Sequence, residues 1–308
     1  IVSECVEVAK SNGKGGASGF VNAVLKKVAD NKFTLPSEND DCYLSVTYSK
    51  PKWFCDKLVA QYGKEKAIEI ISAKSDTLEH IRINSRMATP IDVEFLLKKN
   101  KVEFKKSDVG GYIVKATDCV KRMFDKGLVT FQSPSSMLAV QALNVTDGAQ
   151  VLDICSAPGG KAMYMSEICP HGKITACDLY PHRVALIQKY KNRMHTPNVK
   201  AIQADACVLS DEWKDCFDFV LCDAPCSCLG TFKKHPDVFL NKDEKCVIEL
   251  ADMQRKIIEN AAKYLKVGGK MVYSTCTLFK EENEDVVNDF IAKNDGFALE
   301  KIDGLDRI

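Results

Sequence analysis

The chain has 308 residues, 45% of them hydrophobic, with 43 lysines and arginines against 42 aspartates and glutamates. A chain of this length and hydrophobicity buries a substantial core, as one large domain or two of ordinary size, and is not a disordered protein. The net charge of +1 excludes a globally basic nucleic-acid binder, so any contact with RNA requires a local basic surface.

The 14 cysteines are scattered through apolar runs, and neither a signal peptide nor an apolar stretch long enough to span a bilayer is visible. We therefore expect a cytoplasmic protein with free thiols and no membrane partner, acting as a monomer. The chain opens on Ile1 inside a helix-like pattern, which predicts that it is a fragment of a longer protein.

The first 130 residues divide into three expected parts. Residues 1–30 carry apolar positions at helical spacing around a glycine-rich stretch, which predicts the end of a helical domain. Residues 31–50 are polar and typical of a linker. Residues 51–130 combine helical spacing with short alternating runs, which predicts a small α+β domain, either an RNA-binding platform or a structural spacer. Its expected elements are helices around Gly63 and at 91–99, and strands at 81–84, 102–104 and 112–114.

From residue 131 to 308 strand-like and helix-like segments alternate, which predicts an α/β domain with a doubly wound, Rossmann-like parallel sheet. The expected strands are 151–154, 174–177, 199–203, 217–222 and 270–274, and helices are expected at 183–193 and 253–265. Ligands of such sheets bind at the carboxyl ends of the strands. Each expected strand ends on or near a polar or reactive residue.

The first of these strands runs into a glycine-bearing turn that opens a helix. This turn contains Cys155, Ser156, Ala157, Pro158, Gly159, Gly160 and Lys161. Its small residues allow close approach of a ligand, and the helix N-terminus offers amide donors to a carboxylate. A Walker A loop would need glycine where Cys155 stands and Ser or Thr where Ala162 stands, and the Gly-x-Gly-x-x-Gly dinucleotide pattern is also absent.

Acidic residues follow the next three strands, namely Asp178, Asp205 and Asp223. Asp178 lies about 20 residues beyond the loop, where a doubly wound sheet places a carboxylate on ribose hydroxyls. Asp205 is suited to accept from an adenine amino group, and Arg183 is a further candidate for cofactor binding. An adenosine without pyrophosphate and with a carboxylate at the loop amides describes S-adenosylmethionine. The competing interpretation is that these aspartates are helix N-caps.

Two thiol-bearing runs end the last two strands, Asp223-Ala224-Pro225-Cys226-Ser227-Cys228 and Ser274-Thr275-Cys276-Thr277. Because the two strands are neighbours in the expected sheet, their thiols should face one cleft. The alternative is a metal site that involves Cys222, Cys226 and Cys228. Cys222 is expected in the core of a strand, and no Cys or His pair follows at zinc-ribbon spacing, so we predict no metal.

These motifs together resemble the NOL1/NOP2/Sun family of RNA cytosine-5 methyltransferases. The resemblance rests on the Ala-Pro-Gly-Gly-Lys loop, the Asp-Ala-Pro-Cys-Ser run, and the Ser-Thr-Cys-Thr run followed by residues 281–284. Residues 233–237 look like the bacterial members that modify small-subunit ribosomal RNA, and 16–25 are similar to the end of their NusB-like domain. The chain departs from the family at 132–136, where Gln-Ser-Pro-Ser-Ser replaces Gln-Asp-x-x-Ser, and the closing strands of the family are not found before Ile308.

The resemblance implies a role for each of four residues. Cytosine C5 is too electron-poor to take a methyl group until a nucleophile adds at C6, and a thiolate suits that addition. By resemblance Cys276 is this nucleophile, and Cys226 assists loss of the C5 proton and product release. Asp223 would hold the N3 and N4 edge of the base, with Lys161 as a donor nearby.

The expected partner is RNA, most specifically small-subunit ribosomal RNA, bound at a basic surface. That surface would combine Lys121, Arg122, Lys126, Lys233 and Lys234. Two alternatives stay open, a transfer RNA as acceptor and a non-catalytic ribosome assembly factor that kept the cofactor fold. The presence of both Cys226 and Cys276 argues against the assembly factor. An amino-group methyltransferase is not expected either, because it would show Pro-Pro and an aromatic residue after Asp223, where this chain has Ala-Pro-Cys.

Overall fold

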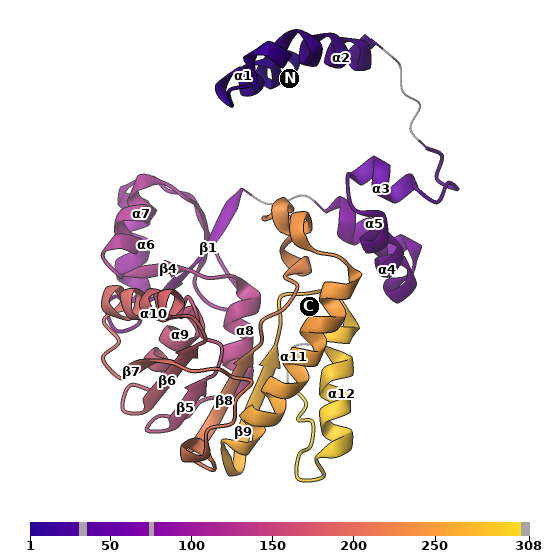
Figure 1. Cartoon of the computed structure of the whole chain (residues 1–308). Coiled ribbons are helices and arrows are strands. Elements are labelled where there is room, and N and C mark those ends of the chain that lie inside the picture. The colour runs from indigo at the N-terminus through magenta and orange to yellow at the C-terminus, as the bar shows by residue number, and fades with distance from the viewer. Residues whose placement is uncertain (31–35, 74–76, 303–308) are drawn as a thin grey trace. The chain divides into compact units, whose positions relative to one another are not determined.

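The computed structural model describes residues 1–30, 36–73 and 77–302 (Figure 1). Along the sequence the chain divides into two compact units, the first ending at Ser72 and the second beginning at Ala73. The parts of the expected linker, helices and domains that fall on 31–35, 74–76 and 303–308 lie outside the described residues. Within the described ranges, no helix is both long and apolar enough to cross a bilayer.

The first unit is helical. Its elements are α1 (Val2–Ser11), the short helix η1 (Gly15–Ala17), α2 (Ser18–Asp30), α3 (Tyr43–Tyr48), α4 (Lys52–Tyr62) and α5 (Lys64–Ser72). Gly63 separates α4 from α5 with a φ of 80°, a conformation that glycine adopts without strain, as the sequence pattern predicted. Residues 43–48 of the expected linker form a helix, and the division of residues 1–130 into three domains stays a prediction.

The second unit begins with a four-stranded antiparallel sheet in the order β2-β3-β1-β4. Its elements are β1 (Leu78–Ile83), α6 (Pro90–Lys99), β2 (Phe104–Lys106), β3 (Tyr112–Lys115), α7 (Asp118–Asp125) and β4 (Val129–Phe131). Ile81, Val93 and Val120 from the sheet and both helices are fully buried against one another. Gly111 packs so closely on β1 that a Cβ there would lie 2.1 Å from the Ile81 carbonyl oxygen, so the sheet requires glycine at this position.

A five-stranded parallel sheet follows in the order β7-β6-β5-β8-β9, which confirms the Rossmann-like prediction. Its strands are β5 (Gln150–Asp153), β6 (Lys173–Asp178), β7 (Val199–Gln203), β8 (Phe217–Asp223) and β9 (Leu265–Ser274). The helices are α8 (Pro134–Leu143), α9 (Gly160–Ile168), α10 (Pro181–Met194), α11 (Glu244–Lys263) and α12 (Glu284–Lys293). The expected helix at 253–265 was wrong at its start, because Asp243 caps α11 at Cys246 N and begins the helix earlier.

Side chains of successive strand residues point to opposite faces of the parallel sheet, so each face has its own hydrophobic core. Val151 and Leu221 pack into one cluster with α8 and α9, whereas Leu152 and Val220 pack into the other with α11. The order of the strands reverses between β5 and β8. The parallel register brings Asp153, Asp178 and Asp223 to the carboxyl edge of the sheet around this reversal, where a ligand crevice is expected.

Buried polar contacts join the antiparallel sheet to the parallel one within the second unit. Arg82 on β1 forms a buried ion pair with Glu167 on α9. Asn84 Nδ2 donates to the carbonyl of Met194 at 2.8 Å, and Arg193 Nη1 donates to the carbonyl of Phe124 at 2.8 Å. The small sheet is therefore fastened to α9 and α10, the two helices that follow the first strands of the parallel sheet.

Candidate active site

The loop between β5 and α9 is held in a compact turn by the neighbouring strand. Ser156 N donates to the Cys177 carbonyl at 2.7 Å, and Gly159 N donates back to the Ser156 carbonyl at 2.7 Å. Gly159 caps α9 with a φ of 107°, a left-handed conformation that favours glycine. The first amides of α9 follow directly, so the turn presents a helix N-terminus to the edge of the sheet.

Asp178, at the end of β6, is buried and fastens this loop from the side. Its Oδ2 accepts a hydrogen bond from Ala157 N at 3.3 Å and lies 3.3 Å from Arg183 Nε. Arg183 Nη2 in turn donates to the Ala157 carbonyl at 3.2 Å. The structure thus brings together three of the residues that the sequence predicted for cofactor binding.

A cavity of about 460 Å³ opens beside the ends of β5 and β7. It is lined by Ile154, Gln203, Ala204, Asp205, Ala206, Val208, Leu209, Ser210, Glu212, Trp213 and Tyr264. Asp205 is exposed, and its Oδ1 accepts from Cys207 N at 2.8 Å. The size and the mixture of apolar walls with a few polar groups suit a nucleoside.

Two residues of the β5 end differ from the rest of the loop in their surroundings. Cys155 packs against the α11-side core, and burial raises the pKa of its thiol well above the ordinary range. Asp153 is 1% exposed, and among the described residues neither oxygen of its carboxyl group has a hydrogen-bond partner. Burial, and then the charge of Asp223, raise the pKa of Asp153 to about 7.

Asp223, at the end of β8, is held by groups from two other elements. Lys161 Nζ, from the first turn of α9, lies 2.5 Å from its Oδ2. Ser274 Oγ, which the β8–β9 register places opposite Asp223, donates to its Oδ1 at 2.7 Å. The predicted pair of Lys161 and Asp223 is therefore in contact, and Ser274 is an additional member that the sequence did not single out.

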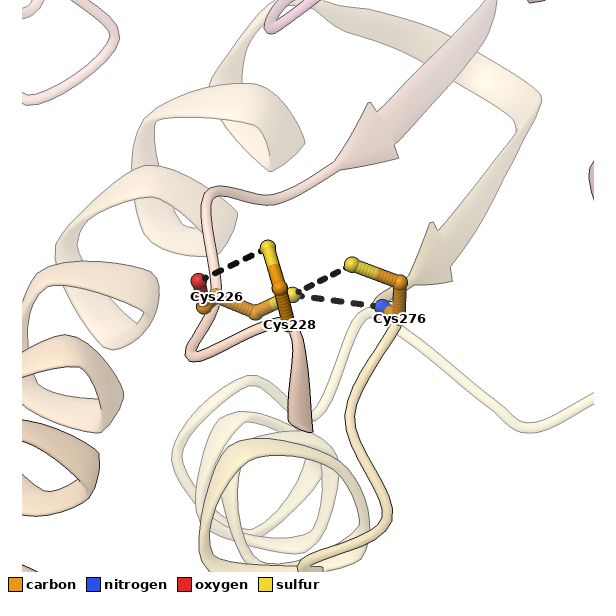
Figure 2. Close-up of side chains that lie close together, drawn as sticks. All are labelled: Cys226, Cys228 and Cys276. Atoms are coloured by element: carbon orange, nitrogen blue, oxygen red, sulfur yellow. Dashed lines mark hydrogen bonds between the residues drawn. The ribbon is translucent and has the colours of Figure 1, made fainter. Parts of the chain in front are cut away.

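Three thiols converge beyond the ends of β8 and β9 (Figure 2). Cys226 Sγ lies 3.1 Å from Cys276 Sγ and accepts from Cys276 N at 3.2 Å, and the Sγ atoms of Cys226, Cys228 and Cys276 all lie within 4.8 Å of one another. Cys226 is buried, whereas Cys276 is exposed. Hydrogen bonds with the thiols of Cys226 and Cys276 lower the pKa of Cys228, and hydrogen bonds with Cys228 and Cys276 raise that of Cys226.

A fully buried carboxylate aligns the two thiol-bearing loops. Glu282, in the short helix η5 (Lys280–Glu282), accepts from Ser227 N at 2.8 Å and from Gln254 Nε2 at 3.0 Å through Oε1. Its Oε2 accepts from Ser227 Oγ at 2.5 Å. Gly230 N donates to the Cys276 carbonyl at 2.9 Å, and a Cβ at Gly230 would lie only 2.7 Å from that oxygen. Sequence reasoning noted Glu282 as part of a motif but missed its contact with Ser227.

The residues predicted to form a basic surface lie in two segments of the second unit. Lys121 and Arg122 are exposed on α7, and Lys126 is exposed just after it. Lys233 and Lys234 are exposed in the segment that follows η3 (Leu229–Thr231). Lys234 Nζ lies 3.3 Å from Glu79 Oε2 on β1, and Lys121 Nζ lies 3.9 Å from Asp118 Oδ1, so two of the five cations already have an acidic partner. Their contact with RNA stays a prediction.

Comparison with known proteins places this geometry in a family. Residues 140–307 match the model of the 16S rRNA methyltransferase RsmB/F family, and residues 1–30 match the NusB family. The chain is 32% identical to the probable ribosomal RNA small subunit methyltransferase B of Bacillus subtilis strain 168, over 97% of this chain and 70% of that protein.

Solved structures agree with the sequence matches. The crystal structure of PH0851 superposes with a TM-score of 0.84 at 27% identity, covering 94% of this chain and 66% of that one. A methyltransferase homolog protein from Pyrococcus horikoshii gives a TM-score of 0.72 at 27% identity, covering 84% and 83%.

The fold, the strand-end site and these matches define an S-adenosylmethionine-dependent RNA methyltransferase. More particularly, the chain belongs to the 16S rRNA methyltransferase RsmB/F family. The predicted family, the Rossmann-like fold and the cofactor are thereby confirmed, whereas the roles of individual residues stay predictions.

Proposed function

We propose that this chain methylates C5 of a cytosine in small-subunit ribosomal RNA through a covalent adduct at Cys276. The observation that carries the proposal is the pair of thiols of Cys226 and Cys276, with Sγ atoms 3.1 Å apart beside Asp223 (Figure 2). One thiol is exposed and free to meet a base, and the other is buried next to it. A reaction in which one thiol attacks and a second group assists release uses both positions.

The cofactor fits the described residues. When bound, S-adenosylmethionine supplies an electrophilic methyl group on a sulfonium centre. The amides of the loop from Cys155 to Gly160 and the start of α9 would hold its carboxylate, with Lys161 and Asp223 bordering the site. Asp178, oriented by Arg183, would hold the ribose, and Asp205 would meet the adenine in the cavity of about 460 Å³.

The remaining steps belong to side chains of the chain itself. The Cys276 thiolate adds to C6, which forms an S–C6 bond and moves electron density onto C5. Asp223 faces the N3 and N4 edge of the base and accepts a hydrogen bond from the N4 amino group, and Lys161 and Ser274 keep Asp223 in position. After C5 carries the methyl group, its proton leaves to water with the assistance of Cys226, and the C5–H electron pair restores the C5–C6 double bond. The S–C6 bond then breaks and returns its electron pair to Cys276.

Trapping of the adduct tests this assignment. Cys276→Ala should give neither methylation nor a covalent RNA complex. Cys226→Ala should still attack and methylate, but slow release should leave a methylated RNA adduct that survives denaturing electrophoresis. Cys216→Ala, at an exposed cysteine outside the cluster, serves as the matched control.

Two other outcomes would change the proposal, and a separate experiment identifies the RNA. An adduct in Cys276→Ala that is lost in Cys226→Ala would exchange the two roles. No adduct with any variant, even on RNA containing 5-fluorocytosine to block proton loss, would favour a non-catalytic assembly factor. Bisulfite mapping of RNA from cells lacking the protein distinguishes ribosomal from transfer RNA, because only the true target loses its 5-methylcytosine.

A further inference from the structure

Cys228 is the third thiol of the cluster, and neither attack nor release requires it. Its backbone lies in the left-handed region with a φ of 61°, a conformation that is unfavourable for any residue with a Cβ. Its Sγ atom lies 3.4 Å from the Cys226 carbonyl oxygen and within 4.8 Å of both other sulfurs (Figure 2). A strained residue at a functional site points to a role for its side chain.

We propose that Cys226, Cys228 and Cys276 together bind one zinc ion as a three-thiolate site, and that this binding switches methylation off. Zinc takes thiolate ligands at about 2.3 Å, which places tetrahedral sulfurs about 3.8 Å apart. The present separations, from 3.1 Å to at most 4.8 Å, bracket that value, so small side-chain rotations suffice. The exposure of Cys276 leaves a path for the ion and a fourth position for water.

The inhibitory part rests on the proposed function, since it requires Cys276 as the nucleophile. A sulfur that donates its electron pair to zinc is no longer free to add to C6. Each thiol that is protonated before binding releases its proton to solvent, and no electrons are transferred, so the site needs no oxidant. Zinc here is a reversible inhibitor and takes no part in catalysis.

Three variants of the 308-residue chain test the site, each kept under reductant. Cys228→Ser removes the third sulfur but keeps a hydrogen-bonding group, and Cys228→Gly in addition relieves the left-handed backbone. Cys216→Ser is the matched control, because Cys216 is exposed and outside the cluster. Cadmium is titrated first and followed by thiolate-to-metal absorption in the ultraviolet. Methyl transfer from labelled S-adenosylmethionine to small-subunit ribosomal RNA is then measured against zinc, with EDTA to reverse it.

The wild type and Cys216→Ser should show one tight cadmium site with thiolate absorption and zinc inhibition that EDTA reverses. Both Cys228 variants should lose intensity at the tight site. Each should also need about tenfold more zinc, or higher, to halve its own zinc-free rate of methylation.

Equal zinc sensitivity in Cys228→Ser would overturn the proposal. Inhibition that stronger reductant reverses and EDTA does not would also overturn it, in favour of a disulfide between Cys226 and Cys276. The cadmium measurement needs no activity, so a chain that binds the ion through these thiols but never methylates RNA would refute only the proposed function.

Discussion

Lys161 Nζ lies 2.5 Å from Asp223 Oδ2, while Ser274 Oγ donates to the other oxygen of the same carboxylate at 2.7 Å. The first turn of a helix and the end of the adjacent strand therefore fix Asp223 from two sides. A carboxylate held in this way does not have to reorganise when a base arrives, which is the condition for strong electrostatic stabilisation.

Removing the positive charge of Lys161 should therefore lower kcat. Lys161→Met keeps the length of the side chain but leaves Asp223 without its charged partner, and we expect kcat to fall by about 100-fold or more. Ser274→Ala removes only a neutral hydrogen bond and should cost about tenfold. Single-turnover methyl transfer to ribosomal RNA measures both, and full turnover in Lys161→Met would contradict the proposed role of the pair.

Cofactor affinity should depend on Asp178. Its carboxylate is buried beside the loop, so Asp178→Ala should cost roughly 1.5–3 kcal/mol of S-adenosylmethionine binding. Asp178→Asn preserves the packing, and Asp252→Ala on the exposed face of α11 is the control. Calorimetry that finds unchanged affinity in both Asp178 variants would refute the assignment, and a nicotinamide dinucleotide should not compete.

The free energy of unfolding of the cofactor-free protein should depend on pH because of Asp153. Because its pKa is raised from 3.8 to about 7, the folded chain keeps a proton that the unfolded chain loses between these two values. Stability should fall as pH rises through that window, by about 1.4 kcal/mol per pH unit from this group, and stay reduced above it.

Asp153→Asn should abolish this contribution and be more stable than the wild type above pH 7. Urea unfolding at pH 5 and pH 8 compares the two proteins. The assignment of the buried carboxyl fails if both lose the same free energy of unfolding between the two pH values.

RNA affinity should depend on the cations of the α7 region. Charge reversal of Lys121, Arg122 and Lys126 removes three candidate phosphate contacts, so binding should weaken and the slope of log affinity against log salt should become shallower by roughly two to three. Reversal of Lys26, Lys27 and Lys66 in the first unit controls for net charge. An unchanged slope in filter binding would show that the small domain is not the platform.

The parallel sheet was predictable because each strand is an apolar run that ends on a polar or reactive residue, as at Asp178 and Asp223. Short elements were not predictable. For example, β4 has only three residues, and its partner strand β1 lies about fifty positions earlier in the chain. The expected strand at 102–104 lies instead at Phe104–Lys106, where pairing with β3 sets its limits.

The reactive residues were also visible in the motifs, whereas the contacts that align them were not. Glu282 reaches Ser227 across 55 residues, and the third sulfur of Cys228 joins the other two only through a left-handed turn. A single sequence shows which side chains carry chemistry but contains no record of which buried acceptor orients a loop. For the same reason, the sequence alone offers Cys222 as a candidate metal ligand, although it is buried in β8.

Arg82, Asn84 and Arg193 fasten the small antiparallel sheet to α9 and α10. These contacts fix the distance between the two sheets of the second unit. Buried ion pairs and hydrogen bonds of this kind are costly to break, so the two sheets should move as one body. A strand of RNA that touches the small sheet and Cys276 at once must then cover a constant span. Under the proposed function, the choice among cytosines would then depend on their spacing along the RNA from an anchored segment, in addition to the identity of the base that reaches the thiols.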